Sequence, residues 1–244
     1  MPDDFSQSDL ELYGLRSASD GGVLFCGVTQ EMFAINGVTY KWPAGVTLRW
    51  HLAFSRLGSI GDMDLKATRE NNLAEISAAC NLKFEYTSNP RTAHLYGVAR
   101  RLDGPSGVLA QHGIPVGNVN DNTQLTGDHD DAERWGIFDG IPPAGFINWQ
   151  PVDLHELLHG MGLGHGQVIP SDPALIQPSY DPRVRHLQRR DKAELVRRYG
   201  EPSAGQPTPP TSGNKPVNYK GIHEIEQNGM VWRGEVNGVL TRVK

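Results

Sequence analysis

The sequence contains few cysteines. Only two of its 244 residues are cysteine, Cys26 and Cys80. Two cysteines are too few for a scaffold built on disulfides, and a chain of this length has enough apolar core to fold without one. Composition is compatible with a single Cys26–Cys80 bridge and equally with two separate thiols.

Long apolar runs and an excess of positive charge are also lacking. No apolar run approaches the roughly 20 residues that span a bilayer. The formal net charge of −5 argues against nucleic acid or an anionic membrane as a partner. Met1–Leu10 is acidic and polar, without the basic start and apolar core of a signal peptide. With 38% hydrophobic and 21% charged residues, the composition is typical of a soluble globular protein.

Shifts in composition divide the chain into four parts. Residues 1–40 begin as a polar leader rich in glycine and serine, and the main domain covers 41–201. A proline-rich linker at 202–216 precedes a small module at 217–244. Two Asn-Gly pairs, at 228–229 and 237–238, predict the turns of a three-stranded β-meander in that module.

Hydrophobic periodicity places several elements in the main domain. Leu48, Trp50 and Leu52 alternate with polar residues, as in a half-buried strand, and residues 82–86 repeat this pattern. Asp62 or Asp64 can cap a helix that runs to about Cys80. Further helices are expected at about 151–162 and 189–199, while 93–150 suggests short strands joined by long loops.

The strongest chemical signal is the stretch from His155 to His165. His155 and His159 are four residues apart, so a helix presents both imidazoles to one ion. Gly162 allows a sharp turn that brings His165 round as a third ligand. Three protein ligands leave a fourth position for water, which indicates a catalytic zinc. Glu156, beside the first ligand, is the predicted general base for attack of zinc-activated water on a peptide bond.

With this motif the sequence resembles the metzincin zinc endopeptidases, and specifically the matrixins (matrix metalloproteinases), over about residues 25–202. The resemblance implies an α+β fold with a twisted, mixed five-stranded sheet and about three helices. It implies protein or peptide substrates and an extracellular, latent enzyme. A virus- or phage-encoded protein, or an unusual export route, would reconcile that compartment with the missing signal peptide.

The resemblance also assigns roles to loop residues. The stretches at 102–110 and 127–135 are similar to the family's calcium loop, which makes Asp103, Asp130 and Glu133 calcium ligands. Two solvated acidic loops are the alternative interpretation. Residues matching the family's edge strand and the wall of its specificity pocket become substrate-binding residues: Val108, Leu109, Ala110, Pro178, Ser179 and Tyr180.

Several positions depart from the family pattern. Tyr96 and Val98 stand in place of a His-x-Asp pair that holds a second, structural zinc, and Gln111 replaces another histidine. A second zinc is therefore doubtful. The remaining histidines of the region are expected to lie on the surface: His94, His112 and His129. An altered metal site formed by these three is the alternative. Ile176 replaces the methionine that packs beneath the metal ligands.

Cys26 corresponds to the cysteine that occupies the fourth zinc position in matrixin precursors. Phe25 and Gln30 replace the arginine and aspartate that flank the family's cysteine. A buried structural thiol, or pairing with Cys80, is the alternative. A different kind of function is also open, in which the module at 217–244 binds a partner and the protease fold is a scaffold. The presence of Glu156 favours the enzyme.

Overall fold

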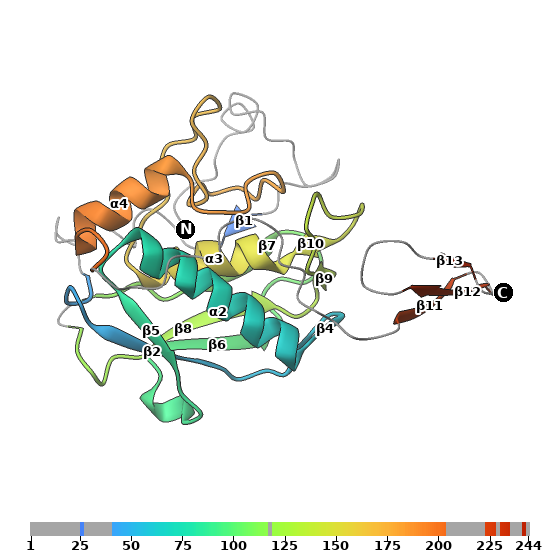
Figure 1. Cartoon of the computed structure of the whole chain (residues 1–244), viewed down its shortest axis with the longest axis horizontal. Coiled ribbons are helices and arrows are strands. Elements are labelled where there is room, and N and C mark those ends of the chain that lie inside the picture. The colour runs from blue at the N-terminus through green and yellow to red at the C-terminus, as the bar shows by residue number, and fades with distance from the viewer. Residues whose placement is uncertain are drawn as a thin grey trace. The chain divides into compact units, whose positions relative to one another are not determined.

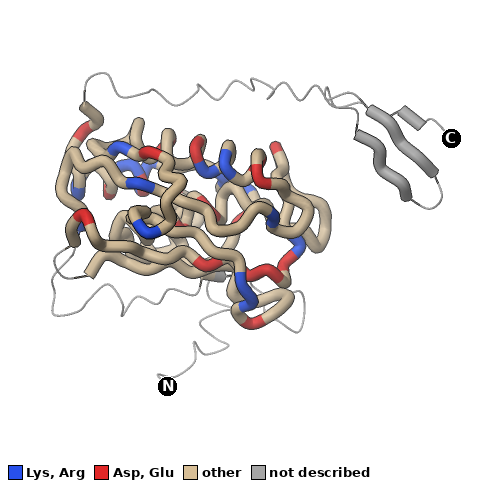
Figure 2. Tube along the Cα trace, turned by 90° about the horizontal axis from the view of Figure 1, so that it is seen from below, with Lys and Arg blue, Asp and Glu red and all other residues tan. Residues whose placement is uncertain are grey.

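The computed structural model describes residues 25–26, 41–116, 119–203, 223–227, 230–234 and 241–242. The chain divides into two compact units, Met1–Thr208 and Pro209–Lys244, with the boundary inside the predicted linker. Of the predicted leader at 1–40, only Phe25 and Cys26 are among the described residues. None of the helices described is both long enough and apolar enough to cross a membrane. Along the described chain, acidic and basic residues are interspersed (Figure 2).

A mixed sheet organises the first unit. Its strands follow the order β1-β7-β8-β6-β2-β5. β2 (Thr47–Leu52), β5 (Lys83–Tyr86), β6 (Leu95–Arg100) and β8 (Leu125–Asp130) run parallel, whereas β7 (Val108–His112) is antiparallel to β8. The two-residue strand β1 (Phe25–Cys26) joins the outer edge of β7 in parallel. Without β1, this is the predicted five-stranded mixed sheet.

Two helices cover one face of the sheet, α2 (Asp62–Ala79) and α3 (Trp149–Gly160) (Figure 1). Leu73, Ile76 and Cys80, spaced three and four residues apart along and just after α2, share one face and are all buried. The predicted aspartate cap is wrong. Gly61 occupies the N-cap position, while Asp62 lies inside the first turn and accepts a hydrogen bond from Lys66 Nζ at 2.8 Å.

The third helix, α4 (Arg189–Tyr199), agrees with the predicted range of 189–199. It contacts α2 and buries Leu195 and Tyr199 in the apolar core. The Tyr199 hydroxyl donates to the carbonyl of Met161, just beyond the end of α3. The C-terminal helix of the domain is thereby tied to the segment that leaves α3.

Short elements complete the two units. β3 (Arg56–Leu57) pairs with β4 (Ile60–Gly61), β9 (Trp135–Gly136) pairs with β10 (Ile147–Asn148), and η4 (Pro90–Thr92) is a single 3-10 turn. In the second unit, β11 (His223–Gln227), β12 (Met230–Gly234) and β13 (Thr241–Arg242) form an antiparallel three-stranded sheet. This is the strand order of the predicted meander.

Candidate metal centre

Helix α3 carries two of the predicted ligands. It begins two residues earlier than predicted and ends at Gly160, with Pro151 in its first turn, where a missing N–H does not interrupt the helix. The four-residue spacing places His155 and His159 on one face, with their ring centroids 4.7 Å apart. Both side chains are almost completely buried. The helix therefore presents two imidazoles inside the protein rather than on its surface.

A sharp turn brings the third histidine back to this face. Gly162 has φ of 78°, a conformation that glycine adopts without strain. Its N–H donates to the carbonyl of His159 at 2.7 Å, and Leu163 N donates to Leu158 O at 3.0 Å. The chain then carries His165 to the other two histidines. The predicted role of Gly162 in the turn agrees with this geometry.

The three ring nitrogens converge on one point. The Nε2 atoms of His155 and His159 are 3.0 Å apart, those of His159 and His165 are 3.1 Å apart, and those of His165 and His155 are 3.3 Å apart. Tetrahedral zinc with Zn–N bonds of about 2.0–2.1 Å separates its nitrogen ligands by about 3.3 Å. The spacing of the three nitrogens thus fits a zinc ion.

Backbone carbonyls set the orientation of two of these rings. His155 Nδ1 donates to Leu175 O and His159 Nδ1 donates to Leu163 O, both at 2.8 Å. With the proton on Nδ1, each neutral ring directs a lone pair from Nε2 toward the common centre. Burial lowers the pKa of His155 to about 4 and that of His165 to about 3, and it also lowers the pKa of His159 well below its usual value. Converging lone pairs on neutral rings favour a cation between them.

Two further side chains stand at the centre, Glu156 and Cys26. The thiol of Cys26 joins the three histidines in a group whose ligand atoms all lie within 4.8 Å of one another. Glu156 is 1% exposed, and its Oε2 has no hydrogen-bond partner. Burial raises the pKa of Glu156 to about 8, and a hydrogen bond with Cys26 offsets this only in part. The carboxyl group is therefore shielded from water while Cys26 is in place.

The segment around Cys26 lies between strand β7 and the segment at Pro178. Phe25 pairs with Val108 and Cys26 with Ala110 along β7, while Cys26 N donates to Pro178 O at 3.2 Å. A pocket lies beside His155 and Glu156. Four of the predicted substrate-binding residues line it: Leu109, Pro178, Ser179 and Tyr180. The other two, Val108 and Ala110, are the β7 residues that pair with β1.

Comparison with known proteins agrees with this geometry. A sequence model of the matrixin family matches residues 44–200, which is well over half of the chain. This chain belongs to the matrixin family. Among curated proteins, none matches it. Matrixins are zinc metalloproteases, so family membership supports zinc metalloprotease activity in general, a catalytic zinc, and protein or peptide substrates.

In this matrixin, the segment Leu175–Ile176 forms the floor beneath the histidines and is held by Asp191, a residue that the sequence analysis did not identify. Asp191 accepts hydrogen bonds from Leu175 N at 2.8 Å, Ile176 N at 3.2 Å and Gln188 N at 2.8 Å. Ile176, at the position of the family's methionine, is 6% exposed and belongs to the apolar core. The sequence did contain a signal for the position of Asp191, because Gln188 and Asp191 form a capping box at the start of α4.

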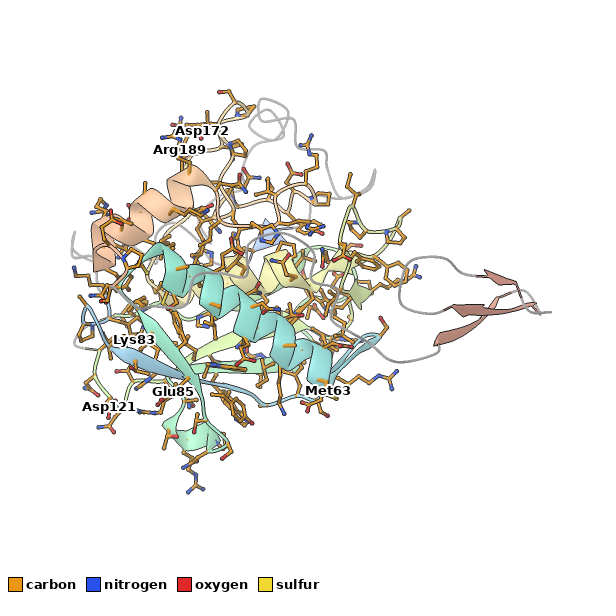
Figure 3. All side chains as sticks on the ribbon, in the orientation of Figure 1. Met63, Lys83, Glu85, Asp121, Asp172 and Arg189 are labelled. Carbon is orange, nitrogen blue, oxygen red and sulfur yellow. The ribbon has the colours of Figure 1, made fainter. Side chains whose placement is uncertain are left out.

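Two arginines of α4 hold the loop that follows His165. Arg190 Nη1 donates to Gln167 O at 2.8 Å and to Asp172 O at 3.3 Å. Arg189 forms an ion pair with the Asp172 carboxylate, and both side chains are labelled in Figure 3. Gly166 N donates to Ile176 O at 3.1 Å, which closes the loop against the floor. The third ligand is thus positioned by α4 as well as by the turn at Gly162.

The three predicted calcium ligands surround one tight loop. Asp130 accepts hydrogen bonds from the backbone N–H groups of four residues at 2.8–3.2 Å: Leu102, Asp103, Gly104 and Ala132. Glu133 Oε1 accepts from Ser106 N at 2.6 Å, and Asp103 Oδ2 accepts from Val108 N at 3.1 Å. Burial raises the pKa of Glu133, and the negative charges of Asp130 and Asp103 raise it further. All three carboxylates therefore organise residues 102–108.

The prediction that three histidines lie on the surface is wrong. His94, His112 and His129 are 1%, 2% and 0% exposed. They do not gather into one group: His94 Nδ1 accepts from Arg49 N at 2.9 Å, whereas the ring of His129 lies near Trp149 and Asp153. In the described part of the chain, the only group of potential metal ligands is the one formed by Cys26 and the three histidines of the metal centre.

The positions where the family holds its structural zinc carry other contacts. Gln111 Nε2 donates to Asp128 Oδ2 at 2.9 Å, and Arg100 forms an ion pair with the same oxygen. Tyr96 stacks on His51 with the ring centroids 5.9 Å apart. Neighbouring strands β6, β7 and β8 are thus joined through one carboxylate and a guanidinium. These residues do not fit a histidine-rich zinc site.

Proposed function

We propose that this matrixin is a zinc endopeptidase in which His155, His159 and His165 hold the ion and Glu156 is the general base. The convergence of three Nε2 lone pairs within 3.0–3.3 Å of one another carries the proposal. The adjacent carboxyl of Glu156 supports a hydrolytic role, because a purely structural zinc site would need no proton acceptor at its open side.

The protein residues divide the chemistry between them. A zinc ion bound there supplies a Lewis acid that polarises the peptide carbonyl and lowers the pKa of water toward about 7. Glu156 accepts the proton of the attacking water and passes it to the leaving amine. β7 offers an unpaired edge to an extended peptide once β1 has left it. The apolar wall beside His155 suits an apolar side chain just after the cut.

The decisive experiment compares three proteins on casein and on fluorogenic peptides, with zinc present and residues 1–40 removed. The chain with native residues should cleave; Glu156→Gln should bind zinc but lose activity by a factor of about 10² or more. His159→Ala should lose the zinc itself. Metal content and thermal unfolding measured on the same samples separate a catalytic defect from a misfolded protein. Equal turnover by the native-sequence protein and Glu156→Gln would refute the mechanism.

We also propose that Cys26 keeps the full-length protein latent by taking the fourth ligand position. Its thiol lies with the three histidines, and β1 lies along β7, where an extended substrate would pair. Cys26 and Cys80 form no disulfide, and the buried Cys80 thiol instead donates to Ile76 O. Cys26→Ala should raise the activity of the untrimmed chain, whereas Cys80→Ala is the matched control. Unchanged activity in Cys26→Ala would remove the switch.

Calcium in the 102–108 loop is a further proposal. Mutual repulsion among Asp103, Asp130 and Glu133 supports a bound cation. Against this, Asp130 already uses both oxygens to hold backbone N–H groups. The test is thermal unfolding with calcium and with a calcium chelator. Glu133→Gln should abolish a calcium-dependent rise in melting temperature, and no rise in the native protein would leave the carboxylates as loop anchors alone.

The second unit has no role in this proposal. Its strands β11–β13 form a sheet of their own. Binding through residues 217–244 stays a prediction, and a pull-down with that fragment would test it.

A further inference from the structure

The outer wall of the pocket beside His155 is a segment without regular secondary structure. Tyr180, Asp181 and Val184 belong to this wall, and Val152 of α3 lies in the opposite lining. Val184 is buried, whereas Arg183 between the lining residues is exposed. A wall of this kind has no strand or helix hydrogen bonds to set its distance from α3. One contact at the pocket itself is the hydrogen bond from Asn148 N, at the N-cap of α3, to the Tyr180 hydroxyl oxygen at 3.2 Å. The part of the wall around Val184 is held by contacts outside the pocket.

Glu75 of α2 provides one such contact. Its Oε1 accepts from the backbone N–H of Leu187 at 2.7 Å, and its Oε2 is 2.9 Å from Nδ1 of His186. The Glu75 side chain is only 16% exposed, whereas His186 is 53% exposed. The shielded bond to the Leu187 amide is therefore the stronger of the two, because exposed ion pairs contribute little.

A second contact holds the segment at Arg185, through Gln150 of α3. Gln150, at the start of α3, donates through Nε2 to Arg185 O at 2.7 Å and to Asn72 Oδ1 at 3.2 Å. Asn72 in turn donates to Gln150 O at 3.0 Å. Asn72 and Glu75 are three residues apart on α2 and so face the same side. Glu75 directly, and Asn72 through Gln150, thus hold residues 185–187, which follow the wall residue Val184 in the chain.

We propose that Glu75, assisted by Gln150, is a positioning residue that determines which side chains the pocket accepts. It touches no substrate. By fastening the backbone at Leu187 to α2, it keeps Val184 at a set distance from Val152 and limits the size of the side chain after the cut. This inference rests on the proposed peptidase function. It adds a determinant of specificity on a helix outside the pocket.

The test uses peptides that differ only in the residue after the cut, leucine or tryptophan, and the protein from which residues 1–40 have been removed. In Glu75→Ala, the ratio of kcat/KM for leucine to that for tryptophan should fall about tenfold, since a freed wall admits the larger ring. Glu75→Gln keeps an oxygen for the Leu187 amide and should retain most of the selectivity. Glu70→Gln, on the exposed side of the same helix, is the control for loss of charge.

A second readout does not depend on the protein's own activity. Trypsin can cut the wall segment at Arg183 and Arg185, and cleavage follows local opening. Glu75→Ala should be nicked there about tenfold faster than the native protein or Glu70→Gln. If the native protein cleaves both peptides and Glu75→Ala has the same selectivity, the inference is overturned. If the native protein cleaves no peptide, the proposed function fails; unchanged nicking in Glu75→Ala would then overturn the anchoring as well.

Discussion

A buried ion pair offers the sharpest test of how α3 is held in place. Arg69 of α2 and Asp153 of α3 pair with both side chains fully buried. Arg69 Nε donates to Asp153 Oδ1 at 3.1 Å, and Asn72 Nδ2 donates to Oδ2 at 3.0 Å. His129 Nε2 lies 3.5 Å from Oδ1. Replacing Asp153 by asparagine keeps the shape of the side chain and removes its charge.

The size of the effect follows from the surroundings of Asp153. Burial, the largest single effect, would raise the pKa of this carboxyl, but the charge of Arg69 and the interactions with His129 together outweigh it, and the pKa falls from 3.8 to about 2. That difference corresponds to about 2.5 kcal/mol of stability at neutral pH. Because the folded-state pKa is the lower one, this contribution is complete above pH 4 and is lost as the pH falls toward 2. Asp153→Asn also leaves Arg69 buried without its counter-charge, so the expected loss is about 3–5 kcal/mol.

Urea denaturation at pH 7 measures this loss of stability. The protein is freed of metal with a chelator and carries Glu156→Ala, so that neither zinc binding nor self-cleavage affects the result. The double variant Arg69→Met/Asp153→Leu removes both charges and should recover most of the stability, because apolar side chains can replace a buried pair. Asp172→Asn breaks the exposed pair with Arg189 (Figure 3) and should cost less than about 1 kcal/mol. The reasoning fails if Asp153→Asn costs no more than Asp172→Asn, or if the double variant is as unstable as the single one.

Two predictions concern His112, which packs between the sheet and α3. Burial lowers the pKa of His112 to about 4, so the folded protein favours the neutral ring and loses about 3 kcal/mol as the pH falls from 6.5 to 4. In His112→Gln, the free energy of unfolding measured in urea should fall less steeply between pH 6.5 and 4, because about one proton fewer is taken up on unfolding. An unchanged slope would contradict the role given to His112. A Cβ added at Gly127 would lie 2.5 Å from His112 Cδ2, so Gly127→Ala should lower stability by about 1–3 kcal/mol. If the contact is the cause, Gly127→Ala should cost clearly less in a His112→Ala background.

The convergence of His155, His159 and His165 could be predicted from the sequence because it depends mostly on local geometry. His155 and His159 are neighbours on any helix, and a glycine at 162 allows the turn that returns His165. The same applies to α4, where Leu195 and Tyr199 mark the buried face and Gln188 with Asp191 marks the start. In each case the relevant residues lie within about three helical turns, so spacing largely determines which side chains meet. Contacts from α4 additionally hold the loop that follows His165.

The buried polar groups behind the centre could not be predicted in this way, because their partners come from distant segments. His112 was expected on the surface, yet it fits beside β8 and α3 because Gly127 and Gly160 have no side chains to exclude it. Likewise, Gly97 leaves space for Arg69, which reaches Asp153 from 84 positions away in the sequence. A histidine or arginine in a loop-rich sequence is normally solvated. Only the pairing of strands and helices reveals the space that these glycines leave.

The position of β1 on the edge of β7 has a consequence for activation. The Cys26 thiol lies with the three histidines, and Phe25 and Cys26 also occupy the edge of β7. Loss of the thiol therefore opens the centre without clearing the strand edge on which an extended peptide would pair. We expect Cys26→Ala to give only part of the activity that follows removal of residues 1–40, with the deficit appearing mainly as a higher KM. Titration of both proteins with one fluorogenic peptide measures this difference, and equal KM values would mean that β1 leaves β7 as soon as the thiol is gone.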